Sequence, residues 1–176
     1  MDFDAKFEDG LNYADFLETY GSPAERKNWQ AVHVRVRLTE AHRELLQSFV
    51  RDMKVLVTAG AWCGDCVNQC PILARFAEQN DCIRLRFFDR DEESQLAQAL
   101  SICGAPRVPA VLFLSEDGHP CGRYGDRTLS KYRSMAGVGD PQGDPLSAVT
   151  QEWLNEFERI QWMLRTSSRL RKLHGD

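Results

Sequence analysis

The chain has 176 residues, of which 43% are hydrophobic and 27% charged, with 22 basic and 26 acidic side chains and a net charge of −4. This length and composition favour one soluble globular domain with a full core, and they exclude a disordered chain. The apolar runs fall short of the roughly 20 residues of a membrane-spanning helix. The negative charge gives no general reason to expect binding to nucleic acid or to a membrane.

The start of the chain and its cysteines bear on location. Residues 1–6 are acidic and lack the apolar stretch of a secretory signal. The sequence has six cysteines, and in the cytosol thiols stay reduced unless they serve as redox or metal groups. We therefore expect a cytoplasmic protein.

Residues 1–38 are predicted to form a helical extension. Within residues 1–20, apolar side chains recur every three or four positions, which predicts a helix packed on the domain, with a partner-binding helix as the alternative. Residues 22–25 read Ser-Pro-Ala-Glu, a capping box with proline at the first helical position. They predict a helix to about residue 33, although the alternating valines at 32, 34 and 36 also fit a strand.

Residues 39–137 are predicted to form the core, with Thr39 as the cap of its first helix. The patterns predict the order helix, strand, helix, strand, helix, strand, strand, helix. The strand after the turn at Asp117-Gly118 is expected at the sheet edge. The expected bounds are 39–50, 54–59, 64–79, 83–88, 95–102, 110–114, 119–125 and 128–136.

Residues 138–176 complete what we expect to be one compact domain. A loop rich in Gly, Asp and Pro over residues 137–145 precedes one long amphipathic helix over residues 147–173. The end of this helix is basic, which complements the helix dipole or forms a docking patch for an acidic partner.

The main functional signal is Trp62-Cys63-Gly64-Asp65-Cys66, which follows an apolar strand and opens a helix. Two cysteines with this spacing at such a junction indicate a redox pair. The helix start favours an anion, so the Cys63 thiolate is expected to be stabilised and able to attack a disulfide. Cys66, one turn later, is placed to resolve the mixed disulfide.

Further motifs extend this pattern along the chain. Val108-Pro109 precedes an apolar strand, and Asp117-Gly118 and Gly125 lie in the last hairpin. Together with the cysteine motif they make residues 40–136 resemble the thioredoxin family, in particular bacterial thioredoxin-like proteins with Cys-Gly-Asp-Cys and helical additions at both ends.

The resemblance implies an α/β, thioredoxin-like fold with a central mixed sheet of about four strands flanked by helices. It also implies that Pro109 is a cis-proline facing the redox pair and that Val108 offers backbone groups to an extended substrate. By the same resemblance, Gly64 and Asp65 set the helix start. The place of Trp62 in the motif predicts an exposed platform that covers the sulfur atoms, with a core residue as the alternative.

Two positions depart from the family pattern. Val57 stands where the family usually has a buried acid that helps to move a proton from the resolving thiol. Asp65 stands where thioredoxin itself has proline. A carboxylate two residues from Cys63 should oppose the thiolate and make the pair more reducing. The alternative is that Asp65 only complements the helix start.

The remaining cysteines give weaker signals. Cys70 is expected to be a buried structural thiol, with a regulatory third thiol or a metal ligand as the alternatives. Burial is the default expectation for Cys82, Cys103 and Cys121, and Cys103 is close enough to Pro109 in sequence to lie near the site. Residue spacing predicts no nucleophile–His–acid set and no phosphate loop.

These observations predict a thiol–disulfide oxidoreductase with a redox-active disulfide and a role in cell redox homeostasis. Cys63 is the expected nucleophile, Cys66 the resolving thiol, and Val108 and Pro109 the substrate-binding residues. The expected partners are a disulfide-containing protein or small disulfide and a reductase or small thiol as electron donor, with no metal or organic cofactor. The alternative is a redox-sensing or non-catalytic binding or chaperone module with a thioredoxin fold.

Overall fold

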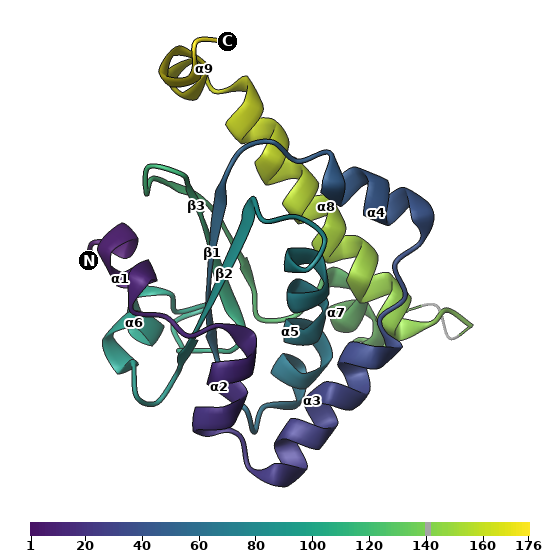
Figure 1. Cartoon of the computed structure of the whole chain (residues 1–176). Helices are drawn as coiled ribbons and strands as arrows, with labels where there is room; N and C mark the ends of the chain where they lie inside the picture. Colours follow the sequence, from purple (N-terminus) through teal and green to yellow (C-terminus); the bar gives the residue numbers. More distant parts are fainter. Residues whose placement is uncertain (140–141) are drawn as a thin grey trace.

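The computed structural model describes residues 1–139 and 142–176, and a four-stranded sheet forms its centre (Figure 1). The strands are β1 (Met53–Ala59), β2 (Ile83–Asp89), β3 (Ala110–Ser115) and β4 (Pro120–Gly125). Their order in the sheet is β2-β1-β3-β4. The β1 strand pairs in parallel with β2 and antiparallel with β3, and β3 pairs antiparallel with β4. The predicted mixed sheet and the edge position of the last strand are therefore confirmed.

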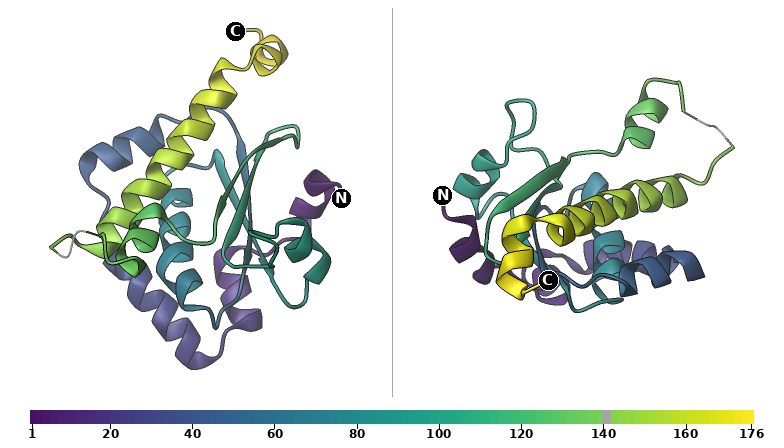
Figure 2. Two further views of the ribbon diagram at one scale, coloured as in Figure 1. Left: turned by 180° about the vertical axis from the view of Figure 1, so that it is seen from behind. Right: turned by 90° about the horizontal axis from the view of Figure 1, so that it is seen from above.

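Helices cover both faces of this sheet (Figures 1 and 2). One face carries α3 (Pro23–Arg35), α4 (Glu40–Gln47), α5 (Gly64–Ala77) and α8 (Pro145–Thr166), and the other carries α1 (Phe3–Glu8) and α6 (Ser94–Ala99). Three further helices are α2 (Tyr13–Tyr20), which packs on β2, α7 (Leu129–Met135), which packs on α8, and α9 (Ser168–His174), which follows α8. The predicted order of elements over residues 39–137 is confirmed. None of the helices in the described residues is long and apolar enough to cross a membrane.

The central strand β1 is buried on both faces, as its continuous apolar run requires. Val55 and Val57 belong to the large cluster beneath α5 and α8. Leu56 points to the opposite face and joins a smaller cluster with Phe7 of α1 and Leu96 of α6. Side chains alternate along a strand, so one apolar segment supports both helical layers.

The first 20 residues differ from the expected single helix. They form α1 and α2, and the chain between them runs along the sheet. Leu11 forms an antiparallel bridge with Phe87, with N···O distances of 3.0 and 2.7 Å. At Gly10 an added Cβ would lie 2.6 Å from the Phe88 ring, so a residue without a side chain lets the chain pass so close. The apolar spacing of this stretch therefore serves strand pairing as well as helix packing.

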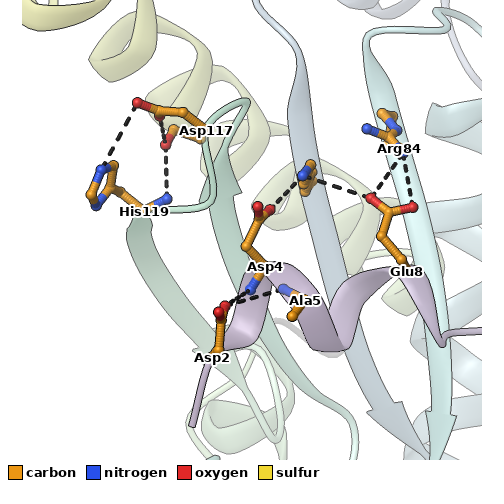
Figure 3. A network of polar contacts seen from close by, with 9 residues as sticks. Asp2, Asp4, Ala5, Glu8, Arg84, Asp117 and His119 are labelled. Atoms are coloured by element: carbon orange, nitrogen blue, oxygen red, sulfur yellow. Dashed lines mark hydrogen bonds and ion pairs between the residues drawn. The ribbon is translucent and has the colours of Figure 1, made fainter.

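Charge fixes the short α1 helix onto the sheet (Figure 3). The Asp2 carboxylate accepts hydrogen bonds from the first-turn amides, at 3.0 and 3.1 Å. Lys54 of β1 is buried and pairs with Asp4 and, at 3.7 Å, with Glu8. Arg84 of β2 lies 3.3 Å from Glu8. The acidic start of the chain is thus a structural feature that holds α1 over the sheet.

The predicted long C-terminal helix is also two helices. Ser167 has extended dihedral angles (φ −64°, ψ 114°), ends α8 and caps α9 through its hydroxyl. Serine favours such a cap because its side chain replaces a missing backbone partner. Arg169 of the basic end pairs with Asp117 in the β3–β4 turn. The loop expected at 137–145 lies partly outside the described residues, which lack 140 and 141.

Candidate functional site

The cysteine pair lies where β1 gives way to α5. Cys63 is the N-cap residue of α5, with extended dihedral angles (φ −82°, ψ 122°), and its carbonyl accepts the first helical hydrogen bond from Val67 at 2.9 Å. Cys63 is partly exposed, whereas Cys66 is fully buried one turn later. The predicted strand-to-helix junction is confirmed. This geometry leaves Cys63 accessible to another molecule and keeps Cys66 behind it.

The turn before Cys63 is held on both sides. The Trp62 ring lies against Gly60, where an added Cβ would be 2.6 Å from it. Trp62 is 50% exposed, and the Arg90 guanidinium lies over its ring, 4.4 Å from the ring centre, in a cation–π contact. The Trp29 indole of α3 donates a hydrogen bond to the Ala61 carbonyl at 2.9 Å. Trp62 is therefore a surface residue beside the thiol and not part of the core.

The loop before β3 faces the same thiol. The Val108–Pro109 peptide bond is cis, and the Cys63 thiol donates a hydrogen bond to the Val108 carbonyl at 3.6 Å. Gly125 at the end of β4 has φ +128°, and an added Cβ would lie 2.3 Å from the Pro109 carbonyl oxygen. A glycine is thus required for the hairpin to approach this loop. This arrangement places the loop at Val108–Pro109 next to the cysteine pair. The role of this loop in substrate binding stays a prediction.

The two thiols interact, and this changes the expected ionisation. Burial raises the pKa of Cys66 well above its ordinary value. The hydrogen bond with Cys66 and burial raise the pKa of Cys63, while the backbone amides of Cys66 and Asp65 act in the opposite direction. The helix amides therefore act on Cys63 in the expected direction, but the thiol neighbour and burial outweigh them. Val57 is fully buried and supplies no acid at its position in β1.

Asp65 has a charged partner that the sequence did not reveal. The Arg127 guanidinium lies 2.7 Å from the Asp65 carboxylate and 3.4 Å from Asp126. Arg107, directly before Val108, lies 3.2 Å from Asp126. This network compensates the charge of Asp65, which we expected to oppose the Cys63 thiolate.

Asp126 is the buried centre of this network. Burial alone would raise the pKa of Asp126, but hydrogen bonds from Tyr132 and Arg107 lower it, and the net shift is downward. The Tyr132 hydroxyl donates to the carboxylate at 2.5 Å. Gln69 of α5 donates to the Asp126 carbonyl at 2.8 Å and accepts from the Trp153 indole of α8 at 3.1 Å. The network joins the cysteine helix, the proline loop and two later helices.

The other cysteines lie in different environments. Cys70 is fully buried one turn after Cys66, as expected. Cys82 and Cys121 are partly buried, and Cys103 is exposed, so the expectation of burial is wrong for Cys103. It occupies the tip of a tight turn, at φ 52°, which the Ile102–Ala105 bridge closes. Within residues 1–139 and 142–176, no group of three or more His, Cys, Asp or Glu side chains could hold a metal ion.

Solved structures with similar folds were found, whereas no curated protein matches the sequence significantly. A protein of unknown function from Pseudomonas aeruginosa has a TM-score of 0.71 at 21% identity, over 88% of this chain and 93% of that one. An HIV epitope-scaffold has a TM-score of 0.67 at 21% identity, over 100% of this chain and 99% of that one. Mitochondrial thioredoxin 3 from Saccharomyces cerevisiae, in its oxidized form, is also similar, with a TM-score of 0.38 at 20% identity over 59% and 95%.

A family model described as thioredoxin matches residues 10–135, which is most of the chain. The match begins in the N-terminal extension and ends at α7, so it spans the whole sheet, the cysteine pair and the proline loop. It agrees with the mixed sheet flanked by helices and confirms the expected thioredoxin-like fold. The chain belongs to the thioredoxin family.

Proposed function

We propose that the protein is a thiol–disulfide oxidoreductase that reduces disulfides in proteins or small molecules. The observation that carries this proposal is the placement of the two cysteines. A partly exposed Cys63 faces the loop at Val108–Pro109, with its thiol 3.6 Å from the Val108 carbonyl, and a buried Cys66 lies one turn behind it. A nucleophile at the surface with a resolving thiol behind it is the arrangement that two-step disulfide exchange needs.

The reaction proceeds in two exchanges. The Cys63 thiolate attacks one sulfur of the substrate disulfide, that S–S bond breaks, and the first half of the substrate leaves as a thiolate. Cys66 then attacks the Cys63 sulfur of the mixed disulfide, its proton passes to the second leaving thiolate, and a Cys63–Cys66 disulfide remains. A reductase or a small thiol returns two electrons to the pair. This cycle needs no metal or organic cofactor and fits a reducing compartment such as the cytoplasm.

A second function is favoured by the buried Val57, which stands in β1 where the family pattern has an acid that moves a proton from the resolving thiol. Burial and the contact between the thiols raise the pKa of both Cys63 and Cys66, which slows attack near neutral pH. A redox-sensing or binding module that exchanges slowly would tolerate such thiols. This alternative retains the same residues but not rapid turnover.

Trapping separates the two functions. In Cys66→Ser, an oxidoreductase accumulates Cys63-linked mixed disulfides that a reductant releases, and mass spectrometry of intact adducts counts them. Cys63→Ser is the matched control and should form none. If Cys66→Ser traps no partner and the wild-type pair forms no reversible disulfide in graded thiol buffers, the oxidoreductase proposal is wrong and a binding module takes its place.

A further inference from the structure

A pocket beside the cysteine helix is lined by neither of the two reactive thiols, Cys63 and Cys66. It has a volume of about 180 Å³, and its lining residues come from the end of α3, the start of α8, α7 and α5, which Figure 1 labels. This volume is below the roughly 300–1,000 Å³ of sites for drug-sized ligands. The pocket therefore suits a small molecule.

The floor of the pocket is apolar. Val32 of α3 belongs to the main core, and Leu146 and Val149 of α8 pack against that core. Asn68 of α5 and Thr128 add polar groups to the wall. An apolar surface with a few polar groups is the usual composition of a small-molecule site.

The rim of the pocket has two acids and two cations, and the acids already have partners. The two acids are engaged, since Asp65 pairs with Arg127 at 2.7 Å and Asp144 accepts from two amides at the start of α8, at 3.3 and 3.1 Å. The two cations of the rim are Arg35 and Lys131. In the part of the chain that the structure describes, neither of these side chains has a hydrogen bond or an ion pair. The pocket thus presents two cations without a side-chain partner above an apolar floor, with the Asp144 carboxylate also in its lining.

We propose that this pocket binds a small organic carboxylate, with its hydrocarbon part against Val32, Leu146 and Val149 and its carboxylate between Arg35 and Lys131. A guanidinium and an ammonium from two different helices form charge-assisted hydrogen bonds with a carboxylate. The apolar floor favours a ligand with a hydrocarbon body over a bare inorganic anion. The binding does not depend on the redox chemistry of the cysteine pair.

Titration of the reduced full-length protein with benzoate, followed by amide chemical shifts, tests this inference. Benzamide is the neutral ligand of the same shape. The test variant is Arg35→Gln with Lys131→Gln, and the matched control is Lys27→Gln with Arg133→Gln, which removes one charge from each of the same two helices outside the pocket. A second variant, Val149→Phe, fills the floor.

We expect saturable benzoate shifts in α3, α5, α7 and α8, which line the pocket, and weaker binding of benzamide. The test pair should weaken benzoate about fivefold, because each exposed charge contributes only modestly, and the control pair should leave it unchanged. Val149→Phe should weaken both ligands. Equal binding of benzoate and benzamide, shifts outside these helices, or unchanged affinity in the test pair would overturn the proposal. The trapping experiment is a separate measurement, so failure of either proposal is seen independently.

Discussion

The Asp65–Arg127 pair gives a sharp test of how this site controls its nucleophile. The two charged groups lie 2.7 Å apart at the start of α5, so their effects on Cys63 largely cancel. Asp65→Asn removes the nearer acidic partner of Arg127, leaves only Asp126 at 3.4 Å, and should lower the pKa of Cys63. Arg127→Gln leaves the Asp65 carboxylate uncompensated and should raise it.

The size of each shift follows from Coulomb's law. A unit charge placed about 7 Å from a thiol, at an effective dielectric constant between about 20 and 80, contributes about 0.6–2.4 kcal/mol, or about 0.4–1.7 pKa units, and we take this range as the upper bound for either variant. The variant that lacks both charges should return close to the starting value. Because Cys63 stays protonated at neutral pH when its pKa is high, the reduction potential at pH 7 is a less sensitive readout than the pKa itself.

The assay is the pH dependence of Cys63 alkylation in a Cys66→Ser background, which removes the coupled titration of the second thiol. Glu78→Gln, at the other end of α5, is the matched control for loss of a carboxylate and should not move the profile. Shifts of the same sign in Asp65→Asn and Arg127→Gln would refute charge compensation. If neither variant shifts the pKa of Cys63, the Asp65 carboxylate only complements the helix start.

Three further predictions concern the same region. Alkylation of the wild-type pair should keep accelerating above pH 8.5, the approximate pKa of a free thiol, because burial and mutual contact raise both pKa values; a plateau below pH 7 would contradict this. Gly125→Ala should destabilise the fold by about 2 kcal/mol or more in denaturant unfolding, since its Cβ would meet the Pro109 carbonyl at 2.3 Å; Gly64→Ala, with open space around it, is the control. Tyr132→Phe should lower the free energy of unfolding by about 1 kcal/mol at neutral pH, because it removes the hydrogen bond to Asp126. The lowered pKa of Asp126 stabilises the fold at pH values above the pKa of this carboxyl in the unfolded chain. The difference between variant and wild type should therefore vanish as the pH falls through the pKa of Asp126 in the folded protein. Tyr20 is about as exposed as Tyr132, so Tyr20→Phe is the control and should leave the free energy of unfolding unchanged. An equal loss of stability in both variants would contradict the role of the Tyr132–Asp126 hydrogen bond.

The cysteine junction was predictable because it depends on neighbouring residues. An apolar strand, a glycine break and a helix start lie within a dozen positions around Cys63, and local propensity and packing agree there. The position of Val108-Pro109 opposite the pair followed from the family resemblance. Both features are found in the structure where the sequence placed them.

The breaks in the terminal helices were not predictable from periodicity. Leu11 keeps the helical spacing of its neighbours, yet its backbone bonds to Phe87 of β2, and only the folded sheet provides that partner. Ser167 likewise interrupts an apolar stripe that continues to Leu170, which is buried beyond the bend. An apolar pattern records which side chains are buried but not whether the backbone stays helical between them.

The partners of Asp65 were missed for a different reason. Arg127 is 62 positions later in the chain, and Arg90 reaches Trp62 from the end of β2. Contacts of this kind depend on strand order, which places the ends of β2 and β4 around the start of α5. The nearest available signal was the position of Arg127 just after the last strand of the hairpin.

The helical extensions contribute to the site and do not merely flank it. Trp29 of α3 fixes the Ala61 carbonyl directly before the Trp62-Cys63 step. Trp153 of α8 holds Gln69, whose amide in turn holds the Asp126 carbonyl. Each buried indole therefore satisfies a polar group that positions one side of the cysteine pair, and a buried group left without its partner carries a desolvation cost. Because the extensions hold the turn before Cys63 and the network around Asp65, the reactivity of the pair depends on the whole chain and not only on residues 39–137.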